Sequence, residues 1–341
     1  MKFDFIIGNP PYQEKVHNEN DRPSPLYNKF MDAAYNISEC VELITPARFL
    51  FDAGQTPKKW NKKMLKDEHL KVLYYNADPS GVFKETQIKG GVVITIRNEK
   101  KNYGAIGFFT KYHELNRILA KVTEFSKEEY IYSIVSPRGS YRLSEVFFHD
   151  FPFASERLGA GTGNMIASNF FEKMPEVWTD ECDEGHTLGF YARVKNKRKI
   201  CYISKKYVLN NQFIDKYNIL FPKSNGSGNF GETLTEPVII KPNFGSTDTF
   251  INIGFFDSLY EAESMTKYIK TKFMRTMLGI KKVTQDNSRG VWKFVPIQDF
   301  TPNSDVDWSQ SVPEVDKQLY KKYRLSQEEI DFIETHVKEM E

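Results

Sequence analysis

The chain has 341 residues, of which 40% are hydrophobic and 27% are charged, and its formal net charge is +2. This length accommodates two domains with separate cores, and the composition is that of a soluble globular protein. No apolar stretch of about 18 residues indicates a membrane span, and the N-terminus lacks the pattern of a signal peptide. The near-neutral charge gives no evidence for a nucleic-acid partner, so any such contact would have to come from local patches.

The cysteine and histidine content argues against disulfide and metal chemistry. Cys40, Cys182 and Cys201 are widely spaced and odd in number, which suits a reducing cytoplasm and forms no zinc pattern. The six histidines show no arrangement typical of a metal site or a catalytic triad. We therefore expect a cytoplasmic protein without a metal centre.

The first hundred residues alternate strand and helix patterns. An apolar run at 3–7 predicts a strand, and residues 25–35 predict a helix with aromatic and apolar residues on one face. Strands are then predicted at 40–44, 70–74 and 90–96, with a short helix around Trp60, Met64 and Leu65 between the first two. This order is typical of an α/β fold that ends in a hairpin-like pair.

The polar segment 98–104 is a candidate domain boundary, which divides the chain into 1–104 and 105–341. Beyond it, short strand-like runs are predicted at 131–135, 187–192, 200–203 and 237–240. Ser258 opens a capping box for a helix running to about Leu278, and Ser326 opens another. A mixed α/β second domain is therefore expected.

The motif that carries chemistry is Asn9-Pro10-Pro11-Tyr12, directly after the first strand. Two prolines fix φ and remove two backbone donors, so their carbonyls and the Asn9 amide are left to face a ligand. In open α/β sheets, ligands bind at the carboxyl ends of strands. With the flat ring of Tyr12, these acceptors form a receptor for a planar amino group. The alternative reading is a surface proline turn.

This motif resembles the catalytic motif of S-adenosylmethionine-dependent methyltransferases that act on amino groups bonded to sp² carbon. The lone pair of adenine N6 is delocalised into the ring, which makes the nitrogen a poor nucleophile. The resemblance implies that the Asn9 side-chain oxygen and the Pro10 carbonyl accept the two N6 hydrogens. It also implies that Tyr12 stacks on a base flipped out of the duplex.

The resemblance extends along the chain. Segment 1–98 is similar to the second half of the catalytic domain of gamma-type DNA adenine-N6 methyltransferases from restriction–modification systems. It implies that Phe30 lies against the adenine of the cofactor and that Phe83 forms the second wall of the base pocket. The alternatives are a core aromatic for Phe30 and a loop aromatic covering the core for Phe83. Segment 255–340 resembles the end of the target-recognition domains of the same enzymes, which implies double-stranded DNA as the partner.

A methyltransferase sheet of this kind has seven strands, and the first three carry the cofactor loop. Only eight residues precede Asn9, so we expect an incomplete Rossmann-like sheet with the later strands only. The first strand would then be a sheet edge. We hypothesise that the N-terminal half is a separate chain or a missing segment. Glycine-rich stretches at 158–164 and 226–230 could be mistaken for the cofactor loop, which follows the catalytic motif in permuted DNA methyltransferases. The favoured reading of both is turns or DNA-facing loops of the recognition domain.

Basic and aromatic residues interleave at 191–199 and 205–207, a pattern that fits DNA contact or a solvated hairpin tip. Lys267, Lys270, Lys272 and Arg275 could also face phosphate, although a solvated helix face is the default.

Three functions compete. The first is adenine-N6 methylation of DNA, by a chain that is possibly inactive when isolated. The second is methylation of a protein glutamine amide, for which the same motif serves. The long region after Ile96 argues against it, because such enzymes end soon after the catalytic domain. The third is a DNA specificity module whose partner chain supplies the cofactor half.

Overall fold

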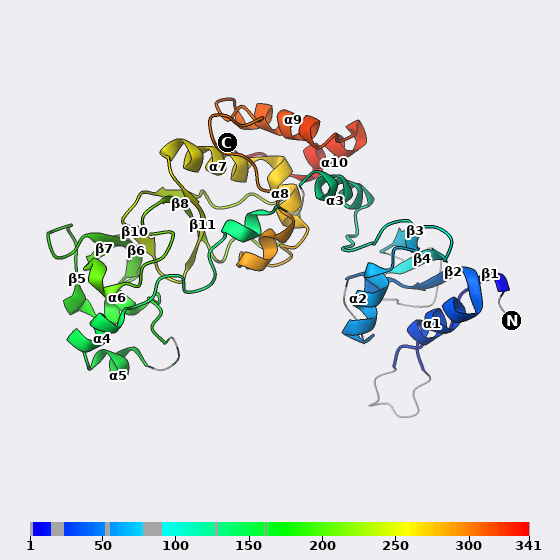
Figure 1. The fold of residues 1–341 in the computed structure, drawn as a ribbon, viewed down its shortest axis with the longest axis horizontal. Helices are drawn as coiled ribbons and strands as arrows, with labels where there is room; N and C mark the ends of the chain where they lie inside the picture. Colours follow the sequence, from blue (N-terminus) through cyan, green and yellow to red (C-terminus); the bar gives the residue numbers. More distant parts are fainter. Residues whose placement is uncertain are drawn as a thin grey trace. The chain divides into compact units, whose positions relative to one another are not determined.

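The computed structural model describes residues 3–14, 24–51, 55–77, 91–126, 129–159, 161 and 163–340 (Figure 1). The chain forms two compact units, unit 1 (Met1–Asn116) and unit 2 (Arg117–Glu341). Each unit is described by itself below.

Unit 1 is built around a mixed four-stranded sheet with the strand order β1-β2-β4-β3. Strand β1 is parallel to β2, whereas β2–β4 and β3–β4 are antiparallel. The sequence predicted these elements in this order, and the α/β class is confirmed. The elements are β1 (Phe3–Gly8), α1 (Tyr27–Ile37), β2 (Ser38–Pro46), α2 (Lys58–Lys66), β3 (Leu70–Asn76) and β4 (Val92–Asn98) (Figure 1).

The core of unit 1 lies on one face of this sheet. The apolar side of α1, with Tyr27 and Met31, packs with Val41 and Leu43 of β2 in one buried cluster. Trp60 of α2 joins the same cluster. Alternate residues of β2 are therefore buried under helices, as expected for a strand with one covered face.

The unit boundary lies further along the chain than the predicted boundary at residue 104. Phe109 is buried, and its ring lies edge-on to Phe51 and Tyr75 at centroid distances of 5.6 and 5.4 Å. The backbone N–H of Gly107 donates to the carbonyl of Leu65 at 2.7 Å. These contacts attach the segment after residue 104 to unit 1.

Strand β1 lies at an edge of the sheet. Among the described residues, β1 pairs only with β2. Three of its side chains point away from the core and are exposed: Phe3 (52%), Phe5 (50%) and Ile7 (72%). The apolar sequence is typical of a strand covered on both faces, yet one face and one edge of β1 are open here.

Unit 2 contains two sheets and several helices. Its sheets have the strand orders β10-β6-β7-β5 and β11-β8-β9, and both antiparallel and parallel pairs occur. Helix α3 (His113–Phe125) begins just before the unit boundary. The other helices are α4 (Glu145–Asp150), α5 (Ala154–Leu158), α6 (Phe170–Lys173), α7 (Leu259–Lys270), α8 (Lys272–Gly279), α9 (Val312–Lys322) and α10 (Gln327–His336). The strands are β5 (Trp178–Thr179), β6 (Leu188–Val194), β7 (Lys197–Ile203), β8 (Tyr217–Pro222), β9 (Val238–Ile240), β10 (Phe244–Ser246) and β11 (Phe250–Phe256).

Two predicted elements of unit 2 differ from the structure. The strand predicted at 131–135 is wrong, because Ile131–Ile134 forms a 3₁₀ helix. Its first N–H donates to Val295, a residue far along the chain, instead of to a strand neighbour. The Ser258 capping box is present and opens α7 as predicted.

The single helix predicted from Ser258 to about Leu278 is instead two helices, α7 and α8, which meet at Thr271. Thr271 has an extended backbone, and its hydroxyl caps α8 by accepting from the N–H of Met274. The buried Asp316 carboxylate of α9 accepts from the N–H groups of Lys272 and Phe273 at 2.9 and 2.8 Å. These acceptors replace the helical partners of the first turn of α8. Burial raises the pKa of Asp316 to about 7, although these bonds lower it.

The C-terminal helix α10 packs closely on a glycine. Gly231 has a φ of +74°, and a Cβ atom there would overlap the carbonyl oxygen of His336. Its own carbonyl accepts from the N–H of Lys338 at 2.9 Å. Gly159 has nearly the same φ, +79°, but a Cβ atom there would meet no atom within 4 Å.

We therefore expect Gly231→Ala to lower the free energy of unfolding of unit 2 by about 3 kcal/mol or more, since backbone must move. In the matched control Gly159→Ala, only the strain of the left-handed backbone opposes the substitution. We therefore expect its free energy of unfolding to fall by about 1 kcal/mol. Urea unfolding of the full chain measures both. Equal losses in the two variants would contradict the packing of α10 on Gly231.

Candidate active site

The Asn9–Tyr12 turn leaves the carboxyl end of β1. The last paired residue of β1, Gly8, lies opposite Leu43 of β2. Asn9 is exposed beyond it, and Tyr12 is partly buried. This is the edge at which parallel strands of α/β sheets present ligand-binding groups.

Backbone hydrogen bonds fix this turn to the start of α1. The carbonyl of Tyr12 accepts from the N–H of Leu26 at 3.0 Å, and the N–H of Glu14 donates to the carbonyl of Ser24 at 2.9 Å. Lys29 on α1 also pairs with Glu14 at 3.2 Å. The turn and the first residues of α1 therefore form one local structure.

The Tyr12 side chain is neutral over the physiological pH range. Burial raises the pKa of its hydroxyl, and the interaction with the Asn9 side chain lowers that pKa to a smaller extent. The Asn9 side chain and the Tyr12 hydroxyl therefore lie close together at the sheet edge.

Two further polar groups lie at this end of the sheet. Asn28 is in the first turn of α1, and Thr45 is near the end of β2. Both are buried, and within the described part of the chain the Asn28 Oδ1 and Thr45 Oγ1 atoms have no hydrogen-bond partner. Buried polar atoms nearly always have partners, so these two atoms are exceptions at this end of the sheet. The sequence analysis identified neither residue. Asn28 follows an aromatic residue and Thr45 follows an apolar one, and neither belongs to a recognisable motif.

Phe30 lies on the outer side of α1. Its side chain is 44% exposed, whereas its helix neighbours Tyr27 and Met31 are 4% and 0% exposed. The structure therefore contradicts the alternative that Phe30 is a core aromatic. Phe83, the other predicted aromatic of the site, lies outside the described residues.

The glycine-rich stretch at 158–164 does not follow a strand. It begins at the end of helix α5, where Gly159 takes the left-handed backbone of a helix cap. A cofactor loop of a Rossmann-like sheet follows a strand and opens a helix. Leu158 and Gly159 thus end a helix, and residues 160 and 162 of the stretch lie outside the described residues.

The second glycine-rich stretch binds a carboxylate of its own chain. Glu232 accepts from the N–H groups of Ser227 and Gly228 at 2.7 and 3.0 Å and pairs with Lys282 at 2.7 Å. Burial would raise the pKa of Glu232, but these partners together lower it to about 2. Its backbone donors are therefore occupied, and the loop is structural.

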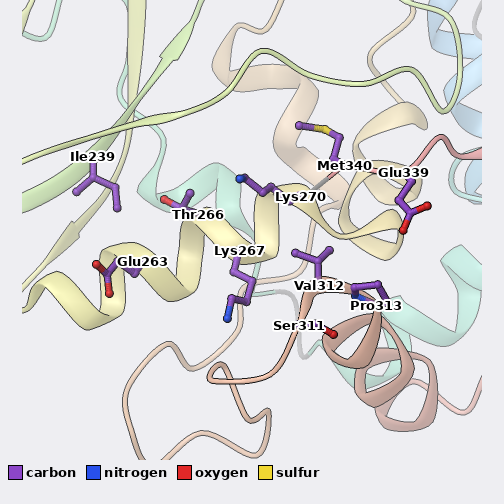
Figure 2. Close-up of a pocket in the computed structure, with 10 residues that line it drawn as sticks. All are labelled: Ile239, Glu263, Thr266, Lys267, Lys270, Ser311, Val312, Pro313, Glu339 and Met340. Atoms are coloured by element: carbon purple, nitrogen blue, oxygen red, sulfur yellow. The ribbon is translucent and has the colours of Figure 1, made fainter.

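The basic residues of α7 and α8 are held in internal contacts. A cavity of about 540 Å³ lies between α7, the start of α9 and the C-terminal residues, and Lys267 and Lys270 line it (Figure 2). Lys267 donates to the carbonyls of Trp308 and Gln310 at 2.6 and 2.7 Å, and Lys270 pairs with Glu236 at 2.6 Å.

The same holds for the two basic residues of α8. Lys272 pairs with Glu334 at 2.5 Å, and Arg275 is only 3% exposed. These contacts assign both side chains, like Lys267 and Lys270, to the packing of unit 2 and not to a phosphate surface.

The described residues contain no group of three or more His, Cys, Asp and Glu that could hold a metal ion. None of the described helices is long and apolar enough to span a bilayer.

Comparison with known proteins bears on the region that contains this turn. Residues 1–83 match the Eco57I restriction-modification methylase family. This match confirms the resemblance predicted from the sequence for the N-terminal segment. The chain is also 30% identical, over 95 residues, to an uncharacterized adenine-specific methylase of Mycoplasma pneumoniae, and the match covers 27% of this chain and 22% of that relative.

Two solved structures align with most of the chain at low similarity. The type IIG restriction endonuclease BpuSI has a TM-score of 0.32 and 8% identity, with 93% of this chain and 50% of that one covered. The type IIL restriction-modification enzyme MmeI, solved in complex with DNA, has a TM-score of 0.30 and 9% identity, with 98% and 56% covered. The chain thus spans about half the length of these two enzymes.

A pair of substitutions on β1 and β2 tests whether one face of β1 is exposed to solvent. We expect Ile7→Lys to change the free energy of unfolding of unit 1 by less than about 0.5 kcal/mol, because this side chain already faces solvent. Val41→Lys, on the neighbouring strand but 1% exposed, should unfold unit 1, since a buried unpaired charge is costly. Thermal unfolding followed by circular dichroism measures both. A large loss in Ile7→Lys would show that this face is covered in the chain alone.

Proposed function

We propose that this chain carries the base-holding half of a DNA adenine-N6 methyltransferase of a restriction–modification system. The observation that carries the proposal is the Asn9–Tyr12 turn at the carboxyl end of β1, inside the segment that matches a restriction-modification methylase family. The adenine-specific methylase of Mycoplasma pneumoniae supports adenine as the target.

In the proposed reaction the turn holds the amino group of a flipped adenine. The Asn9 side-chain oxygen and the Pro10 carbonyl accept the two N6 hydrogens, and Pro11 keeps the turn rigid. This favours a pyramidal nitrogen whose lone pair faces the methyl donor, and the two oxygens stabilise the positive charge that develops on it. Tyr12 stacks on the base, and we assign the opposite wall of the pocket to Phe83.

S-adenosylmethionine supplies the methyl group when it is bound. Among the described residues, Phe30 offers an exposed ring for its adenine, and unpartnered Asn28 Oδ1 lies on the same helix. Neither glycine-rich stretch of the described chain is built as a cofactor loop. Of the described residues, Phe30 is the one we assign to the cofactor, and we propose that additional strands supply further parts of the site.

We propose that those strands add to the open edge of β1, from a separate chain or from a preceding segment. The edge leaves backbone groups of β1 without a second neighbour in the described sheet, which is a template for strand addition. Beside it lie Phe5 and Ile7, whose exposed side chains would be covered by the added half. The isolated chain should then bind DNA without methylating it, which is also the alternative function of a specificity module.

Unit 2, under this proposal, is the target-recognition domain that binds double-stranded DNA. It is a separate compact unit with its own core, as a recognition domain requires. The proposal places both units in the cytoplasm, where the DNA is.

The test is transfer of labelled methyl groups from S-adenosylmethionine to duplex DNA. The full chain is assayed alone and with the polypeptide encoded immediately upstream of it. We expect transfer only in the combined sample, and a loss of about 10²-fold or more in Asn9→Ala, because one of two acceptors at the reacting nitrogen is removed. Asn36→Ala, an exposed asparagine on the same helix as Phe30, is the control and should retain full activity.

Unchanged transfer in Asn9→Ala would end the catalytic assignment. Transfer to a protein glutamine instead of DNA would replace the proposed substrate. No transfer in any combination would overturn the proposed reaction and leave the specificity module as the function.

A further inference from the structure

The β6–β7 hairpin of unit 2 (Figure 1) and the residues directly after it carry basic side chains that differ in their contacts. In sequence, the basic residues of this region form one uniform run. In the structure some of them are neutralised within the chain, whereas others are exposed and have no carboxylate partner in the described residues. The second group defines a surface.

The neutralised group contains three lysines. Lys199 pairs with Asp180 and lies over the ring of Trp178. Lys205 pairs with Asp215 at 2.8 Å. Lys206 pairs with Asp150 at 2.9 Å, which helps to lower the pKa of that carboxyl to about 2. None of these three is an isolated positive charge.

The second group is centred on two arginines. Arg193 of β6 and Arg198 of β7 lie directly opposite each other in the strand register, so they project from the same face of the sheet. Both are exposed, and no carboxylate in the described part of the chain pairs with either. Like charges at directly opposed positions destabilise a sheet. An anion bound over the two guanidinium groups would relieve this repulsion.

Both guanidinium groups are held in place. Arg198 lies over the ring of Phe250 at 4.7 Å and near that of Tyr191 at 5.9 Å. Arg193 donates to the side chain of Asn196 at 2.7 Å. Ordered guanidinium groups lose less entropy when they bind a phosphate, and their planar donors match its oxygens.

The turn of the hairpin carries further basic residues. Lys195 and Asn196 have φ values of 48° and 62°, which is the backbone of a tight two-residue turn. The backbone N–H of Lys195 is tied to Glu172 at 2.6 Å, so the turn is anchored to α6. The side chains of Lys195 and Lys197 are exposed at this tip. Lys197 lies opposite Val194 in the register, so its side chain projects from the other face of the hairpin. The surface of Arg193, Lys195 and Arg198 is named the hairpin cation surface below.

We propose that the hairpin cation surface binds the phosphate backbone of duplex DNA. The proposal rests on the proposed function, which makes DNA the partner of unit 2, and it assigns the contact to these three side chains. Phosphate contacts of this kind fix the position of the protein on the duplex and do not read its sequence. Lys199, Lys205 and Lys206 lie outside the surface.

The test is binding of the full chain to a fluorescein-labelled duplex, measured by anisotropy over a range of salt concentrations. Arg193→Ala/Arg198→Ala should weaken binding at least about tenfold at low salt, since two charge-assisted contacts are lost. The slope of log K against log salt should fall in magnitude by about 2. Arg193→Lys/Arg198→Lys should restore most of the slope, because it keeps the charges.

Lys205→Ala/Lys206→Ala is the matched control, since it removes the same charge from lysines that are already paired. It should weaken binding less than about twofold. Thermal unfolding checks that each variant is folded.

Equal losses in the arginine and lysine pairs, or an unchanged slope in the arginine pair, would overturn the assignment of this surface. Preference for a single-stranded RNA or an acidic protein over the duplex would overturn the partner. The methyl-transfer assay with Asn9→Ala decides the proposed function separately, because the arginine variants are judged by duplex binding alone, without S-adenosylmethionine.

Discussion

The parallel pairing of β1 with β2 on one side only is the constraint on which the account of unit 1 depends. This pairing sets the Asn9–Tyr12 turn at the carboxyl edge of the sheet, where the return to α1 holds it by backbone hydrogen bonds. In the described sheet, the same pairing leaves the other edge of β1 open and Ile7 exposed. The proposed receptor for a planar amino group and the open edge therefore result from one arrangement.

Unit 2 uses its charges in two ways. Many basic side chains are paired with carboxylates inside the unit. Lys282 and Glu232 close a glycine-rich loop, and Lys270 pairs with Glu236. Arg193 and Arg198, by contrast, face each other without a carboxylate partner in the described structure. The chain therefore has a local cationic surface although its net charge is near zero. Contact with phosphate requires such a surface.

The sequence predicted the elements of unit 1 well, because hydrophobic periodicity and turn residues are local signals. The prediction from sequence failed where a residue far along the chain determines the local structure. The helix opened by Ser258 ends at Thr271 because Asp316, on α9, provides acceptors for a new helix start. The Asn9–Tyr12 motif was recognisable from its residues alone, whereas the unpartnered Asn28 and Thr45 atoms are visible only once the sheet and α1 are assembled. The roles of Phe30 and Phe83 remain proposals.

The central claim is that the base-holding turn and the cofactor loop lie on different parts of the enzyme. Calorimetric titration of the full chain with S-adenosylmethionine tests it most directly. The account predicts no saturable binding by the chain alone, and binding with one site once the upstream polypeptide is added. Tight, saturable binding by the isolated chain would contradict it, because the chain alone would then contain a complete cofactor site.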